Sequence, residues 1–366
     1  MRKSLAVTLI IFAGAVLSPA QQKTDSKEVK TADQVFKNIQ SLKGVPADQV
    51  IPAMRYFSAA LGVQCNFCHV TQPQWAPDKD DKQEKRTARQ MIAMTEGINR
   101  SNFKGKPEVG CNTCHSGHHE PVALPLMADE RKPTPNRARE QKQPTLPTVE
   151  QVAQKYEEAI GGRAAIQKLT TRVAKAAFAG GQGQEFQVEL WQKAPDMAVS
   201  VVTLPNGQSR EQGFDGETGW SKNARGVSTL SGPELANVRM NSEFYRDLTP
   251  TAGLTNAKVV GTDTVDGREC IVVRGSDREQ DVSERLFFDQ QDGLLLRRTS
   301  IQRTLFGPLG ENADYSDYKE VQGVKVPFSV KRSSPDSVMM RTLESVEFNK
   351  SIEPSRFSAP KPASSK

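Results

Sequence analysis

The stretch Cys65-Asn-Phe-Cys68-His69 is repeated downstream as Cys111-Asn-Thr-Cys114-His115. Both copies read Cys-x-x-Cys-His, the pattern at which a c-type haem is attached to a chain. Two thiols one helical turn apart can form thioethers with the two vinyl groups of one porphyrin, and the imidazole that follows then lies over the iron. The chain has five Cys and four His, and the two motifs use four of the five Cys and two of the four His. The sequence therefore predicts two covalently bound haem c groups, attached through Cys65, Cys68, Cys111 and Cys114 and ligated by His69 and His115.

A zinc site and disulfides are two other interpretations of the Cys pairs. A four-cysteine zinc site usually draws its pairs from positions closer in sequence, and it gives no role to a His directly after each pair. Disulfides are common in exported chains. They do not explain why both pairs are followed by His, so haem attachment is the favoured interpretation.

The first twenty residues have the pattern of a signal peptide. A basic start at Arg2 and Lys3 precedes an apolar run from Leu5 to Leu17, and small residues stand before Gln21. No Cys follows this cut, so a bacterial lipid anchor is not indicated. No later run approaches the roughly 18 apolar residues that a membrane span requires. We expect an exported, periplasmic protein that is soluble or peripherally bound to a membrane.

Composition and local patterns divide the chain into segments. With 366 residues, 36% of them hydrophobic and 25% charged, it has the length of about two globular domains. The net charge of +6 is modest, and no basic run interleaved with aromatic residues suggests nucleic-acid binding. We predict a signal peptide (residues 1–20), a mainly α-helical di-haem cytochrome c domain (21–120) and a Pro-rich linker (121–147). An α+β domain with a curved, open-barrel-like antiparallel sheet (148–358) and a disordered tail (359–366) follow.

Methionine side chains are the candidate sixth ligands of both irons, because a c-type haem with a proximal His often takes a Met thioether. A helix is expected over Thr31 to Leu42, and a second helix places Met54 on one face with Phe57 and Leu61. Gly62 is the expected C-cap, and the reversal after it would bring Met54 back over the porphyrin.

The second motif is preceded by a longer helical pattern from Gln83 to Phe103. Met91 and Met94 stand one turn apart on it, and either could reach an iron; periodicity does not choose between them. His118 and His119 directly follow the second motif. We interpret them as surface or propionate-neighbouring residues, with ligation by one of them as the alternative.

Three segments of the sequence resemble the cytochrome c subunit of photosynthetic reaction centres. They run from Phe57 to His69, from Thr87 to Asn99 and from Val109 to Gly117, within a resemblance that covers about residues 34–120. The resemblance implies that each haem packs against a helix that supplies an axial Met, which falls on Met54 for the first haem and on Met91 for the second. Family members carry four haems and often a lipidated Cys, whereas this sequence has two haem motifs and lacks that Cys. The resemblance therefore implies electron transport more directly than photosynthesis.

The C-terminal half predicts two short helices followed by antiparallel strands. The helices fall near Val149 to Ile160 and Ala164 to Leu169, and a third is expected near Pro233 to Asn241. The following strands alternate in polarity, and Pro327 suggests that its strand lies at an edge. The order of elements resembles the periplasmic lipoprotein-carrier (LolA-like) fold, which implies an apolar ligand in this half. Cys270 is read as a buried structural thiol.

Three functions follow from these features. The first is an exported electron carrier, not an enzyme, with a redox donor and an acceptor protein as partners, a membrane-bound electron-transfer complex being one candidate. The second is a di-haem peroxidase, which would need one haem with an open coordination position. The third is a lipid- or peptide-binding periplasmic protein that also has a redox module.

Overall fold

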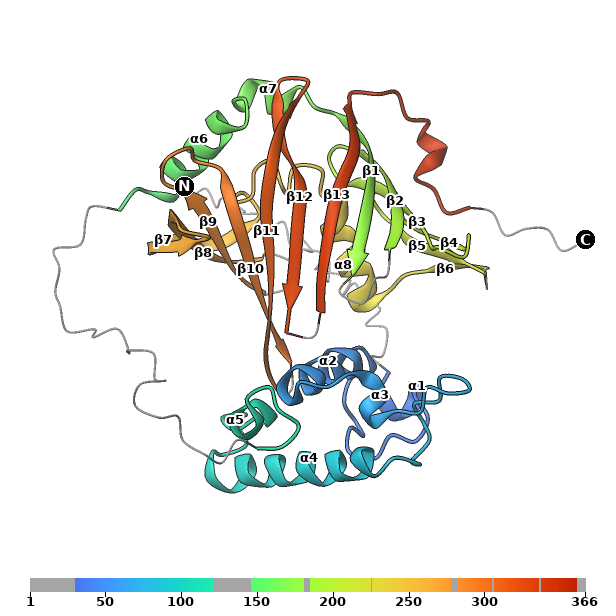
Figure 1. Ribbon diagram of the computed structural model, residues 1–366. Coiled ribbons are helices and arrows are strands. Elements are labelled where there is room, and N and C mark those ends of the chain that lie inside the picture. The colour runs from blue at the N-terminus through green and yellow to red at the C-terminus, as the bar shows by residue number, and fades with distance from the viewer. Residues whose placement is uncertain are drawn as a thin grey trace, which may run out of the picture.

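The computed structural model describes residues 30–121 and 146–360, apart from residues 181–184, 225, 278–281, 305 and 336. Figure 1 shows two lobes, which we call the helical lobe (residues 30–121) and the sheet lobe (residues 146–360). The predicted signal peptide, nearly all of the predicted linker and most of the predicted tail lie outside the described residues. None of the described helices is long and apolar enough to cross a membrane.

The helical lobe is built from short helices around one longer one. Its elements are α1 (Ala32–Val35), the 3-10 helix η1 (Ala47–Gln49), α2 (Val50–Leu61), α3 (Cys65–Cys68), α4 (Gln83–Asn102) and α5 (Cys111–His115). The helix predicted over Thr31 to Leu42 is wrong in length. Phe36 is extended, and the Asp33 carboxylate accepts a hydrogen bond from Gly44 N at 2.9 Å, so a loop replaces the later turns.

The end of α2 lies against the segment that follows α5. Gly62 is the C-cap, as predicted, with φ of 63°. Gly117 N donates a hydrogen bond of 2.9 Å to the carbonyl of Ala60. A Cβ on Gly62 would lie 2.0 Å from the Gly117 carbonyl oxygen, so only glycine permits this approach. The helix before the first motif and the end of the second motif are thereby packed together.

The sheet lobe begins with α6 (Val149–Ala159) and α7 (Arg163–Gln167) and continues into one large sheet. The sheet confirms the antiparallel C-terminal sheet expected from the sequence. Its thirteen strands run in the order β6-β5-β4-β3-β2-β1-β13-β12-β11-β10-β9-β8-β7, and every neighbouring pair is antiparallel (Figure 1). The strands are β1 (Thr171–Gly180), β2 (Glu185–Lys193), β3 (Met197–Thr203), β4 (Ser209–Phe214), β5 (Gly219–Asn223), β6 (Gly226–Thr229), β7 (Leu254–Val265), β8 (Arg268–Asp277), β9 (Ser283–Asp289), β10 (Leu295–Thr304), β11 (Gly307–Val321), β12 (Val324–Ser334) and β13 (Ser337–Phe348). Helix α8 (Gly232–Ser242) lies between β6 and β7, and the 3-10 helix η2 (Pro354–Arg356) follows β13.

The placement of Pro327 at a sheet edge is wrong. Its strand, β12, lies between β11 and β13. Pairing with β13 begins only at Ser329, so Pro327 lies in a part of the strand that has one paired neighbour, Tyr318 on β11. The β11–β12 register is continuous here, with Asp317, whose φ is 53°, and Phe328 left out of the pairing together. The missing N–H of Pro327 is tolerated because β13 does not pair at this position.

The two lobes meet at the hairpin between β10 and β11. Phe306, at its tip, is 9% exposed and belongs to the hydrophobic core of the helical lobe. Its ring centroid lies 4.8 Å from that of Phe57 on α2. A Cβ on Gly110, just before α5, would lie 2.5 Å from the Tyr56 hydroxyl and 2.6 Å from the Phe306 carbonyl oxygen. The hairpin tip therefore packs directly against the start of the second motif.

Candidate functional site

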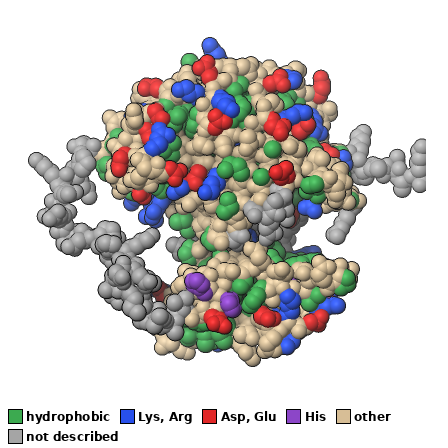
Figure 2. Space-filling model, in the orientation of Figure 1, with side chains coloured by type: hydrophobic (Ala, Val, Ile, Leu, Met, Phe, Trp, Pro, Cys, Tyr) green, Lys and Arg blue, Asp and Glu red, His purple; other side chains and the backbone are tan. Residues whose placement is uncertain are grey.

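One cavity of about 760 Å³ runs through the helical lobe, a size typical of cofactor pockets. All four His of the chain belong to this lobe, and Figure 2 shows His side chains on its surface. The structure brings every predicted site residue to this cavity, although the two motifs are far apart in sequence. The lining includes Met54, Cys65, Cys68, His69, Met91, Met94, Cys111, Cys114, His115 and His119.

The first motif holds its imidazole in a defined orientation. His69 follows the single turn of α3, and its Nδ1 lies 3.1 Å from the Pro77 carbonyl oxygen. A carbonyl only accepts hydrogen bonds, so Nδ1 carries the proton and Nε2 is left with its lone pair. Burial lowers the pKa of His69 below that of a free imidazole, which keeps the ring neutral at neutral pH. A neutral ring with a free Nε2 is the form that binds iron.

The second motif repeats this arrangement. His115 Nδ1 lies 2.9 Å from the His118 carbonyl oxygen, so its Nε2 is likewise free. The loop before the motif is held by Asn99 on α4, whose side-chain amide donates to the Val109 carbonyl at 2.7 Å and accepts from Val109 N at 2.9 Å. Asn99 is 9% exposed, so both bonds are shielded from water. These contacts fix the approach of the chain to Cys111.

The candidate thioether ligands lie on two helices that face the cavity. Met54 is half-buried on α2. Met91 and Met94, on α4, are 36% and 48% exposed, and both line the cavity. Thr95 Oγ1 donates a hydrogen bond of 2.9 Å to the Met91 carbonyl, and Thr95 lines the same cavity. Three Met side chains thus lie on the wall of the cavity that both motifs line.

The donor set and the walls fit a covalently held, flat apolar group. Val35, Phe36 and Ile51 line the cavity while 50%, 37% and 58% exposed, which is unusual for three large apolar side chains grouped in one lobe. None of the four motif cysteines forms a disulfide, and burial raises the pKa of the Cys68 and Cys111 thiols, so these side chains are protonated at neutral pH before they react. A porphyrin edge would cover this apolar wall.

The zinc interpretation finds no matching geometry. Among the described residues, no group of three or more His, Cys, Asp or Glu side chains is placed to hold a metal ion. A four-cysteine zinc site needs both Cys pairs within one coordination sphere. The pairs instead lie on separate single-turn helices, α3 and α5, that line one cavity.

Sequence reasoning missed the groups that position these side chains. The Pro77 and His118 carbonyls belong to no motif, because any residue supplies a carbonyl. The charged segment at residues 78–86 also belongs to no motif, yet part of it is held in place. The Asp80 carboxylate forms ion pairs of 2.9 Å with both Lys85 and Arg89, and these two cations hold its pKa well below its usual range.

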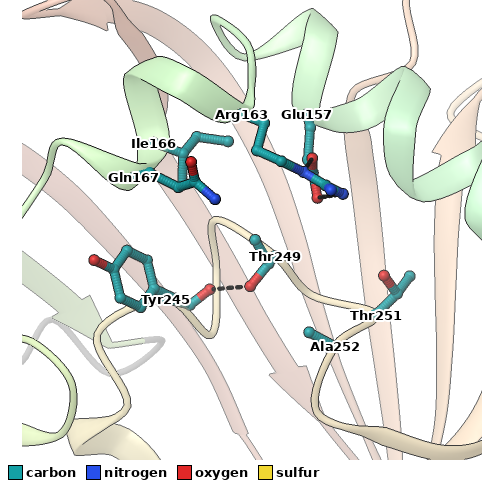
Figure 3. A pocket seen from close by; sticks show the side chains of 8 residues that line it. All are labelled: Glu157, Arg163, Ile166, Gln167, Tyr245, Thr249, Thr251 and Ala252. Carbon is teal, nitrogen blue, oxygen red and sulfur yellow. Dashed lines mark hydrogen bonds and ion pairs between the residues drawn. The ribbon is translucent and has the colours of Figure 1, made fainter.

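The sheet lobe contains a smaller cavity of about 340 Å³. Figure 3 shows Glu157 and Arg163 on its helical side, joined by an ion pair of 2.7 Å, and Thr249 on the loop that faces them. Elsewhere in this lobe, Arg246 is bound by two buried carboxylates, those of Asp277 and Glu284, at 2.9 and 2.8 Å. Cys270 is fully buried on β8, as expected.

Comparisons with known proteins divide the chain in the same way. A family model described as photosynthetic reaction centre cytochrome C subunit matches residues 6–160, and this supports a cytochrome c-like role with haem c binding in that part. No curated protein sequence matches the chain.

Solved structures align with the other part. A LolA superfamily protein from Nitrosomonas europaea shares 12% identity with a TM-score of 0.43, over 58% of this chain and 98% of its own. A DUF1329 family protein from Desulfovibrio piger shares 13% identity with a TM-score of 0.41, over 57% of this chain and 97% of its own. A putative outer membrane lipoprotein-sorting protein domain from Vibrio parahaemolyticus shares 12% identity with a TM-score of 0.40, over 57% of this chain and 94% of its own.

Proposed function

We propose that this protein is an exported di-haem c-type cytochrome that carries electrons between a donor and an acceptor protein. The observation that carries this proposal is the paired geometry of the motif histidines. Both rings donate Nδ1–H to a backbone carbonyl and leave Nε2 free, at 3.1 and 2.9 Å, and both line one cavity with Met side chains. The number of haems, two, follows from the number of complete motifs.

The same geometry favours electron transfer over enzymatic turnover. An iron bound by His on one face and by Met on the other has no open position for a substrate, and a Met ligand favours the ferrous state. The chain's own contribution is to orient the imidazoles, to supply the thioethers of Met54 and of Met91 or Met94, and to exclude water behind apolar walls. The bound haem supplies the one-electron chemistry.

Location and partners are proposed from the sequence. The signal-peptide pattern of residues 1–20 supports export from the cytoplasm. Attachment of c-type haem normally takes place outside the cytoplasm, so the two signals agree. A redox protein on either side is required, and a membrane-bound electron-transfer complex, photosynthetic or respiratory, would suit a periplasmic carrier. An apolar ligand in the sheet lobe remains a separate proposal, which native mass spectrometry of detergent-free protein would test.

The decisive experiment is mass and optical analysis of protein made together with haem-ligation machinery. We expect a mass increase of two haems, low-spin spectra, and the weak far-red band of a Met–iron bond. Met54→Ala should convert one haem to a high-spin form, and Met91→Ala and Met94→Ala should show which of the two binds the other iron. Met240→Ala, on α8 in the sheet lobe, is the matched control. A colourless product, or a high-spin iron with peroxide turnover in the unmutated protein, would overturn the proposal.

A further inference from the structure

The two motif histidines differ in what else binds their carbonyl partners. The Pro77 carbonyl, which accepts from His69, also accepts a hydrogen bond of 2.8 Å from the ammonium group of Lys85. The same ammonium donates to the Lys79 carbonyl at 2.7 Å and pairs with Asp80 at 2.9 Å. With its side chain only 11% exposed, Lys85 is held in a fixed, poorly hydrated position. An unbroken chain of contacts runs from ammonium to carbonyl to imidazole.

The net charge around the contacts that link Lys85 to His69 is positive. Asp80 is a single carboxylate shared between Lys85 and Arg89, and the Arg89 side chain is 17% exposed. Lys82 places a third ammonium group against the Asn66 carbonyl within the first motif. Residues 78–89 hold five cations and four carboxylates. The charges that act on the His69 ring are those of Lys85, Arg89 and Lys82. A Lys in the first turn of α4 also opposes the helix dipole, so its position must be stabilised by these partners.

The second site differs at the matching carbonyl, that of His118. Among the described residues, the His115 ring is the only side chain that hydrogen-bonds to the His118 carbonyl. His119, which follows this carbonyl, lies 3.9 Å from the Glu120 carboxylate, and its ring packs against Phe67 in the first motif, with ring centroids 5.8 Å apart. An anion close to a haem stabilises the ferric state, and a cation destabilises it, because oxidation adds a positive charge.

We propose that Lys85 raises the reduction potential of the haem attached at Cys65 and Cys68 above that of the haem attached at Cys111 and Cys114. This inference rests on the proposed function. An ammonium group bound to the Pro77 carbonyl draws electron density from it, so the carbonyl accepts more weakly from the imidazole. The imidazole then donates less charge to the iron, and the ferrous state is favoured. The positive charge acts in the same direction, so Lys85 is a positioning and tuning residue.

The test is a potentiometric titration of the holoprotein, which should show two midpoints. Lys85→Gln should lower the upper midpoint by about tenfold in the equilibrium constant for reduction, about 59 mV for one electron, and should leave the lower midpoint in place. Lys85→Arg should restore the upper midpoint. Lys79→Gln removes an exposed charge from the same loop without touching the Pro77 carbonyl, and it should have little effect.

A second variant acts in the opposite direction and does not remove Lys85. Asp80→Asn leaves Lys85 and Arg89 without their shared carboxylate, so the upper midpoint should rise. Haem count and the far-red Met–iron band should stay unchanged in both variants, which separates tuning from loss of a ligand. An unchanged upper midpoint, or a shift of the lower one, would overturn the proposal. A single midpoint in a protein that carries two haems would also overturn it, whereas a haem count below two would refute the di-haem function itself.

Discussion

Phe306 is the residue on which docking of the two lobes depends most directly. It lies at the tip of the β10–β11 hairpin, is 9% exposed, and packs against Phe57 with ring centroids 4.8 Å apart and ring planes tilted by 58°. Burial of a Phe side chain contributes about 1.5–3 kcal/mol, and an aromatic pair adds about 0.5–1.5 kcal/mol. Phe306→Ala should therefore destabilise the helical lobe by about 3 kcal/mol. A Phe-to-Ala change in a closed core costs about 3–5 kcal/mol, and a hairpin tip that can withdraw belongs at the lower end.

The assay is denaturant unfolding followed by two probes. Haem absorbance reports on the helical lobe. In a background that carries Trp75→Phe, the remaining fluorescence comes from Trp191 and from Trp220, which is 1% exposed, and reports on the sheet lobe. In Phe306→Ala the haem transition should move to lower denaturant while the fluorescence transition stays nearly in place. Phe103→Ala, which removes a Phe that is 38% exposed at the end of α4, is the control and should cost much less. A change below about 0.5 kcal/mol for Phe306→Ala, typical of a surface site, would refute packing of the hairpin tip in the helical core.

Three further predictions concern backbone, loop and thiol chemistry. Gly62→Ala should destabilise the helical lobe by well over 1 kcal/mol, because Gly62 has a φ of 63° and a Cβ there would lie 2.0 Å from the backbone after α5. Gly97→Ala is the control inside α4, where open space surrounds the residue, and it should be neutral or stabilising. Thermal unfolding measures both variants, and equal effects would contradict the capping role of Gly62. Asn99→Leu should cost about 1–3 kcal/mol and reduce haem loading, because the backbone of Val109 loses two buried hydrogen bonds; unchanged loading by absorbance would count against it. In the holoprotein, thiol titration should find one Cys per chain after denaturation and none before, because Cys270 is buried and its pKa is raised to about 11; three thiols would mean that only one haem is attached.

Local chemistry explains why much of this protein could be predicted from sequence. Covalent attachment requires two Cys and a His within five consecutive residues, so the motifs at 65–69 and 111–115 are visible without a fold. The Gly62 cap follows from the left-handed backbone that ends a helix. Alternating polarity indicates the antiparallel strands of the sheet lobe, because side chains of a strand point to opposite faces in turn. Each signal lies within a few residues of its effect.

The tertiary structure decided what depends on distance along the chain. Packing decides which carbonyl accepts a hydrogen bond from each imidazole, and it places Lys85 against one of these carbonyls. Packing also inserts Phe306 into a core formed by residues 32–92. No local sequence pattern links the segments that meet in these contacts. Carbonyls are present in every residue and Lys is usually solvated, so neither has a sequence signature. Only the folded chain gives these ordinary groups a defined position beside the haem site.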